Sequence, residues 1–180
     1  MGKRKVSTFS VLALIIGLSG LGVGVFSLYN TQQLVNRVNT PKPLTRVFRS
    51  SDYSIPRLSW ETVNFNVLDY DKTDDFNLLT NQFICPTSGY YLISAMLTFV
   101  IMNDGEAIFI TAVREGIREA GSAAHASQTN SLSVGFTDIV YLNAGDSLEL
   151  RAYHTGDDDR IIDGSTAGTY MYFTIAAIGG

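Results

Sequence analysis

The sequence predicts an all-β domain built as an antiparallel β-sandwich, preceded by one transmembrane helix. Three observations lead to this fold class: a long uncharged apolar segment near the N-terminus, a proline-containing break after it, and a series of short apolar runs separated by turn residues. The break is Pro41-Lys42-Pro43, where a helix does not continue easily because proline lacks the amide donor. We therefore expect two parts, residues 1–40 and 41–180, and the second is long enough for one domain with its own core.

Residues 11–29 form the predicted transmembrane helix. This segment contains no charged residue, and at about 1.5 Å per residue it spans roughly 28 Å, close to the hydrocarbon thickness of a bilayer. The basic cluster Lys3-Arg4-Lys5 precedes it, so the positive-inside rule predicts a single-pass protein of the cell membrane with a cytoplasmic N-terminus and an extracellular C-terminal domain. The alternative is a cleaved signal peptide, which usually has a shorter apolar segment and a small-residue cleavage site.

Small residues recur along this predicted helix at alternating spacings of four and three. The resulting helix-packing seam contains Ala13, Gly17, Gly20, Gly24 and Ser27, and the same rhythm continues to Thr31, Leu34 and Val38. Small residues let helices approach closely in lipid, and a heptad spacing lets parallel helices supercoil. The pattern therefore favours an anchor that self-associates. The alternative is that glycine is simply frequent in transmembrane helices.

The second part of the chain contains apolar runs of strand length. Five of them are typical of β-strands: residues 89–100, 107–113, 131–142, 147–153 and 169–178. Turn residues separate them, as in Asn103-Asp104-Gly105 and Asn143-Ala144-Gly145-Asp146, and Gly116 favours a hairpin over a helix within residues 106–124. Residues 147–153 alternate apolar and polar side chains, as in a half-buried strand. Such spacing predicts an antiparallel sandwich.

For one predicted strand, the sequence also indicates which face is buried. Side chains of one parity point to one face of a strand. The face that we expect in the core carries Tyr91, Ile93, Ala95, Leu97 and Phe99, and Tyr90 is expected to point the other way.

Six residues of this part form a spaced set, with five, four, six, five and one residues between successive members. They are Phe65, Asp71, Phe76, Phe83, Gly89 and Tyr91. The spacing resembles the aromatic signature of the C1q globular domain, a jelly roll of the C1q/tumour-necrosis-factor superfamily. Residues 140–148, which contain Gly145 and Asp146, are similar to a late hairpin of that family. The resemblance covers residues 45–180 and implies about ten strands and a homotrimer packed through aromatic and aliphatic side chains.

The sequence offers few residues for catalysis. Cys85 is the only cysteine, so no intrachain disulfide forms, and we expect this thiol to be buried as a small apolar group. His125 and His154 are the only histidines, and neither has a metal-ligand spacing, so both are expected at the surface or in loops. A G-x-S-x-G motif is absent. We therefore do not expect an enzyme.

A cluster of acidic residues is the one candidate for a cofactor site. It contains Asp157, Asp158, Asp159 and Asp163. Closely spaced carboxylates suit Ca²⁺, which takes six to eight oxygen ligands, and the resemblance makes this place reasonable because some C1q-like domains bind calcium near the apex of the trimer. The alternative is an acidic loop that is simply hydrated.

The charge distribution narrows the class of partner. Residues 1–40 carry four basic and no acidic side chains, whereas residues 41–180 carry nine basic and 17 acidic ones. An exterior domain with this excess of acid lacks the basic stripe that nucleic-acid binding needs. The leading prediction is a membrane-anchored, trimeric recognition or adhesion module that binds a protein or glycan ligand. The alternatives are a structural subunit of a surface filament or coat and, last, a hydrolase or lyase on a jelly-roll scaffold.

Overall fold

The computed structural model describes residues 26–32 and 42–179. Residues 26–32 form a short helix, in which the Thr31 hydroxyl donates to the Ser27 carbonyl oxygen over 2.8 Å. Over these two described ranges no helix is long and apolar enough to cross a bilayer. Most of the predicted transmembrane helix, residues 11–29, lies outside the described residues. So do these members of the predicted seam: Ala13, Gly17, Gly20, Gly24, Leu34 and Val38.

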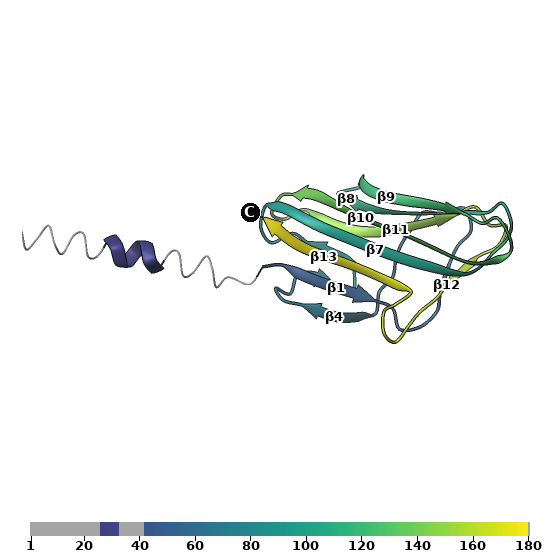
Figure 1. Ribbon diagram of the computed structural model, residues 1–180, viewed down its shortest axis with the longest axis horizontal. Helices are drawn as coiled ribbons and strands as arrows, with labels where there is room; N and C mark the ends of the chain where they lie inside the picture. Colours follow the sequence, from purple (N-terminus) through teal and green to yellow (C-terminus); the bar gives the residue numbers. More distant parts are fainter. Residues whose placement is uncertain (1–25, 33–41, 180) are drawn as a thin grey trace, which may run out of the picture. The chain divides into compact units, whose positions relative to one another are not determined.

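The chain divides into two units, Met1–Pro41 and Lys42–Gly180. The second unit contains every strand of the described residues, and these strands form two antiparallel sheets (Figure 1). The larger sheet has seven strands: β2 (Tyr53–Ile55), β12 (Arg160–Ile162), β7 (Gly89–Met102), β13 (Met171–Gly179), β1 (Leu44–Phe48), β4 (Val67–Asp71) and β10 (Asn130–Leu142). The smaller sheet has six: β5 (Phe76–Asn77), β6 (Gln82–Ile84), β11 (Ser147–His154), β8 (Ala107–Arg114), β9 (Ile117–His125) and β3 (Glu61–Thr62).

The long strand β7 organises the larger sheet. It pairs with β10 along its whole length and with β13 over most of it, and β12 joins it at Phe99. Figure 1 shows β7, β13 and β1 side by side in one layer, as their registers require. The first and last strands of the domain also pair, because Leu44 lies opposite Ala176.

The predicted antiparallel β-sandwich is confirmed, whereas the predicted strand count is wrong and the predicted transmembrane helix lies mostly outside the described residues. The described residues contain thirteen strands rather than about ten. The additional strands are short: β2, β3, β5, β6 and β12 have two or three residues each, too few to show an alternating pattern. The predicted hairpin at Gly116 is confirmed. It joins β8 to β9 through Glu115 and Gly116, whose φ angles of 48° and 82° are those of a hairpin turn that favours glycine at its second position.

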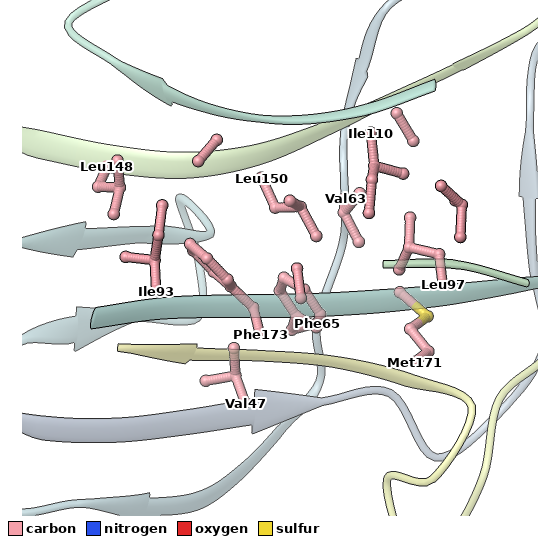
Figure 2. Packing of buried hydrophobic residues seen from close by; sticks show 14 of the residues in the cluster. Val47, Val63, Phe65, Ile93, Leu97, Ile110, Leu148, Leu150, Met171 and Phe173 are labelled. Carbon is pink, nitrogen blue, oxygen red and sulfur yellow. The ribbon is translucent and has the colours of Figure 1, made fainter. Parts of the chain in front are cut away.

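The core lies between the two sheets and is almost entirely aliphatic and aromatic. Figure 2 shows Phe65 and Phe173 close together in it. Their rings are stacked, with centroids 6.4 Å apart. The predicted inner face of β7 is confirmed, because all five side chains of that parity are buried and Tyr90 is exposed on the opposite face. Since Lys42–Gly180 contains this complete core, the unit has what it needs to fold by itself.

A buried ion pair fixes the loops at one end of the sandwich. Glu106 follows the turn after β7, Arg160 begins β12, and their side chains are only 9% and 11% exposed. Arg160 Nε donates to Glu106 Oε2 over 2.9 Å, and the Asn103 amide donates to the same oxygen over 2.9 Å. The Arg160 hydrogen bond is the largest influence that lowers the pKa of Glu106 to about 2.

Truncating the core tests the packing. We expect Phe173→Ala to lower the free energy of unfolding of residues 42–180 by about 3–5 kcal/mol, because it leaves a cavity beside Phe65. Equilibrium urea unfolding measures this loss. The control Leu79→Ala removes a side chain that is 94% exposed and should change stability by less than about 0.5 kcal/mol. Equal effects of the two substitutions would contradict the described core.

The ion pair predicts acid sensitivity. The pKa of Glu106 falls from 4.5 to about 2 on folding. The ion pair therefore contributes fully to the stability of the domain above the pKa of the unfolded chain, and this contribution is lost as the pH falls toward the pKa of the folded state. This difference corresponds to roughly 3 kcal/mol. We expect Glu106→Gln to be less stable at neutral pH and to lose less stability on acidification from about pH 5 to about pH 2. Urea unfolding of both proteins at several pH values measures this, and an unchanged pH slope in the variant would contradict the role of the pair.

Candidate assembly face and sequence-predicted site residues

The structure places the aromatic residues of the predicted signature together in the core. The rings of Phe65 and Phe76 meet edge to face with centroids 6.3 Å apart, and those of Phe83 and Tyr91 do so at 5.8 Å. Gly89 begins β7 two residues before Tyr91. These rings pack in the core between the two sheets, and the Tyr91 hydroxyl donates to the Thr87 carbonyl oxygen at 2.7 Å.

The two carboxylates among the predicted fold residues hold turns. Asp71 accepts hydrogen bonds from the Thr45 hydroxyl at 2.9 Å and from the Phe76 amide at 2.8 Å. Asp146 accepts from the Asn143 amide at 2.9 Å, which is the main cause that lowers the pKa of Asp146 below its usual value. Gly145 precedes it with a φ of 91°. Both carboxylates therefore act in the fold.

The outer face of the seven-stranded sheet carries a contiguous apolar surface, which we call the assembly face. It consists of Leu44, Tyr90, Leu92, Ile139, Tyr141 and Ala176. Their contiguity follows from the registers: Leu92 lies opposite Ile139 on β10 and opposite Ala176 on β13. Tyr90 and Tyr141 are also paired, with ring centroids 5.3 Å apart.

Farther along the same strands the outer face also carries polar side chains. The Ser94 and Thr137 hydroxyls are hydrogen bonded at 3.0 Å, and those of Thr98 and Ser133 at 2.8 Å. The apolar side chains thus gather at the end where the chain enters β1 and leaves β13. A surface of this kind suits contact with another protein chain better than contact with a small polar ligand.

The predicted calcium ligands do not form a metal cluster within one chain. Asp157, Asp158 and Asp159 are exposed in the loop after β11, and Asp163 follows β12. The Asp159 carboxylate accepts a hydrogen bond from the Arg57 amide at 3.1 Å. Among residues 26–32 and 42–179, no three metal-ligating side chains converge. Calcium binding here stays a hypothesis that requires backbone oxygens or a second chain.

The prediction for His154 is wrong, because this side chain is fully buried. Its Nε2 lies 3.1 Å from the Ile55 carbonyl oxygen, and its Nδ1 accepts the Gly156 amide at 3.1 Å. The alternation of residues 147–153, continued by one position, puts residue 154 on the inner face and was the signal that could have placed it. His125 is exposed, as expected.

Sequence reasoning also missed the burial of Glu149. The alternating pattern puts this residue on the outer face of β11, yet Glu149 is buried. Arg151 Nε donates to its carboxylate over 2.6 Å, and Thr62 and Gln82 donate over 3.3 Å each. Thr62 and Gln82 come from β3 and β6, which are too short to recognise in the sequence.

The expected burial of Cys85 is confirmed. Removal from water raises the pKa of its thiol, and the thiol donates to the Thr87 carbonyl oxygen at 3.2 Å. A buried thiol with a raised pKa is a poor nucleophile.

Comparison with solved structures finds similar folds, among them the following two. The globular domain of zebrafish complement 1qA protein aligns with a TM-score of 0.57 and 20% identity, over 76% of this chain and 98% of that one. Eiger TNF from S. frugiperda aligns with a TM-score of 0.58 and 13% identity, over 77% of this chain and 93% of that one. The fold is therefore the jelly roll shared by C1q and TNF proteins.

Comparison of sequences gives the family. A search of curated protein sequences finds no match. The family model of the C1q domain matches residues 47–174, which include all six residues of the spaced signature and eleven complete strands from β2 to β12. The chain belongs to the C1q domain family.

Proposed function

We propose that this chain is a membrane-anchored, trimeric recognition or adhesion module that binds a protein or glycan ligand at the cell surface. The observation that carries the proposal is the assembly face. It combines exposed tyrosines with aliphatic side chains on the sheet formed by β10, β7, β13 and β1, and membership of the C1q domain family implies a trimer.

Physical chemistry favours a partner for this face. Exposed apolar side chains scattered singly are normal, but a contiguous patch on a soluble domain marks a contact surface. Leu92 and Ile139 lie next to each other at its centre, and two tyrosines flank them. Tyrosine and aliphatic side chains free of charge are typical of the buried centre of an interface. Three copies packed through this face would remove it from water.

The N-terminal part supplies the proposed anchor. Residues 11–29 are uncharged and long enough to cross a bilayer as a helix, and Lys3-Arg4-Lys5 sets the orientation. The seam of small residues would bring three such helices together beneath the domains. The proposed module is not an enzyme: Cys85 is buried, and both ring nitrogens of His154 face backbone partners.

The assembly face predicts the solution mass of residues 42–180. We expect light scattering to give three times the mass of one chain for the native sequence. Ile139→Lys should give a monomer, because it places a charge at the centre of the apolar surface. Ile117→Lys is the matched control, since Ile117 on the other sheet is 62% exposed and Ile139 is 54% exposed, and it should remain trimeric.

Two outcomes of this measurement would contradict the proposal. A native monomer would show that the domain does not assemble through this face, and a trimer of Ile139→Lys would place the contact elsewhere. The same measurement with calcium and with a chelator tests calcium binding, the role predicted for Asp157, Asp158, Asp159 and Asp163, because assembly or melting that depends on calcium would support a calcium site. Identical results in both solutions would contradict the calcium hypothesis.

The anchor predicts the behaviour of the full chain in cells. We expect it in the membrane fraction after washing with alkaline carbonate, because about 19 apolar residues insert stably into a bilayer. Deletion of residues 1–40 should release the domain into the soluble fraction. Mass spectrometry of the N-terminus identifies processing. A mature chain that lacks residues 1–29 would contradict the anchor, and cleavage between the basic cluster and the apolar segment would favour the filament subunit instead.

A further inference from the structure

A shallow groove crosses the outer face of the six-stranded sheet, on the side of the sandwich opposite the assembly face. We call it the aromatic trough. It has a volume of about 460 Å³, and its lining includes Trp60, Phe109, Thr111, Arg118, Gly121, Ala123 and the acidic Glu119. Its volume lies within the range of small-molecule sites, which is about 300–1,000 Å³.

The wall of the trough is a continuous row of rings. Trp60 stacks on Tyr153 of β11 with centroids 5.3 Å apart, and Phe109 of β8 lies 5.9 Å from the same tyrosine. The Arg118 guanidinium of β9 lies 4.2 Å from the centroid of Trp60. Because β8 runs between β11 and β9, the indole bridges two strands and lies across the face of the sheet.

The floor of the trough is built from small residues. The registers place Gly121 opposite Thr111 and Ala123 opposite Phe109. A Cβ at Gly121 would lie 2.5 Å from the Ile110 carbonyl oxygen, so a larger residue would require the backbone to move. The floor therefore stays open between Trp60 on one side and Phe109 on the other.

Arg118 brings unused hydrogen-bond donors to this groove. Within the part of the chain that the structure describes, its only partner is the Trp60 ring, and it forms no ion pair. The neighbouring arginines differ: Arg114 pairs with Glu119 at 2.6 Å, and Arg151 pairs with Glu149. The fork of a guanidinium matches a carboxylate with two parallel hydrogen bonds, and stacking on an aromatic ring holds it in place.

We propose that the aromatic trough binds a sugar ring that carries a carboxylate, with the ring packed against Trp60 and Phe109 and the carboxylate paired with Arg118. The C–H groups of a pyranose face suit the negative face of an aromatic ring. The excess of acid in the domain disfavours a polyanion such as nucleic acid. A single carboxylate meets mainly nearby charges, because charge effects are screened beyond about 8 Å. In the trough these are Arg118 and Glu119, and the Glu119 carboxylate is already paired with Arg114.

This inference deepens the proposed function and rests on it for its biological meaning. If three domains pack through the assembly face, the outer face of the other sheet remains free on each of them. Three identical troughs then point outward from one trimer. Monosaccharide contacts are weak individually, and three of them would act together on a surface that carries many glycans.

The test is a titration of residues 42–180 with carboxylated sugars and with their neutral counterparts. Binding is monitored through the NMR signal of the single indole N–H and through tryptophan fluorescence. The probes are glucuronate with glucose, galacturonate with galactose, and N-acetylneuraminate with N-acetylmannosamine. We expect at least one acid to bind with a dissociation constant of about 1 mM and at least about tenfold more tightly than its neutral counterpart. Absence of saturable binding by all three acids, or equal binding of acid and neutral sugar, would overturn the proposal.

Variants locate the site. Arg118→Gln should reduce acid binding about tenfold and abolish the preference over the neutral sugar. The matched control Arg57→Gln removes an exposed arginine outside the trough and should bind as the native domain does. Trp60→Ala removes the largest ring of the wall and should abolish binding. Ala123→Trp instead leaves Trp60 and Arg118 in place and fills the space beside Phe109, its partner across the strands, so it should abolish binding even if Trp60→Ala fails to fold. Native binding by Ala123→Trp or by Arg118→Gln, with folding verified by circular dichroism, would overturn the proposal.

The assembly variant separates the two proposals. Ile139→Lys should bind each free sugar as the native domain does, because Ile139 lies on the other sheet. A native trimer that binds no carboxylated sugar would overturn the inference and leave the proposed assembly intact. A native monomer that binds these sugars through Arg118 would contradict the proposed assembly and leave the inference about the trough intact.

Discussion

Strand β7 couples the interior of this domain to its outer surface, because alternate side chains of one strand point to opposite faces. Its inner residues Ile93, Leu97 and Phe99 fill the core, and its outer residues Tyr90 and Leu92 belong to the assembly face. A slip of its register by one residue would exchange the two sets. The tight packing that fixes β7 between β10 and β13 therefore also fixes the surface available for contact with other chains.

Local patterns in the sequence predict the long strands but not the contacts between distant segments. The alternation of β7 and β11 and the glycine turns predicted strands, and the spaced aromatic residues indicated the family. The same alternation contained the inward position of His154, which we assigned instead from the usual exposure of histidine. Strands β3 and β12 were missed because two or three residues show no period, and the Glu106–Arg160 pair joins residues 54 positions apart.

The candidate sites were less accessible to sequence analysis than the fold. The assembly face depends on how Leu92, Ile139 and Ala176 align across three strands, and these residues are far apart in the chain. The aromatic trough combines Trp60 from a connecting segment with Arg118 from β9, which meet only after the smaller sheet forms. Such surfaces arise from register and strand order, for which a single sequence contains no direct signal.

The pairing of Leu44 with Ala176 places the entry and the exit of the domain at one end of the sandwich. Tension applied between residue 42 and the loops at the opposite end would pull β1 along its own length. Because β1 is hydrogen bonded to β13 on one side and to β4 on the other, this load would act in shear on two ladders at once. Their hydrogen bonds must then break together rather than one after another, so the domain is built to resist pulling in this direction.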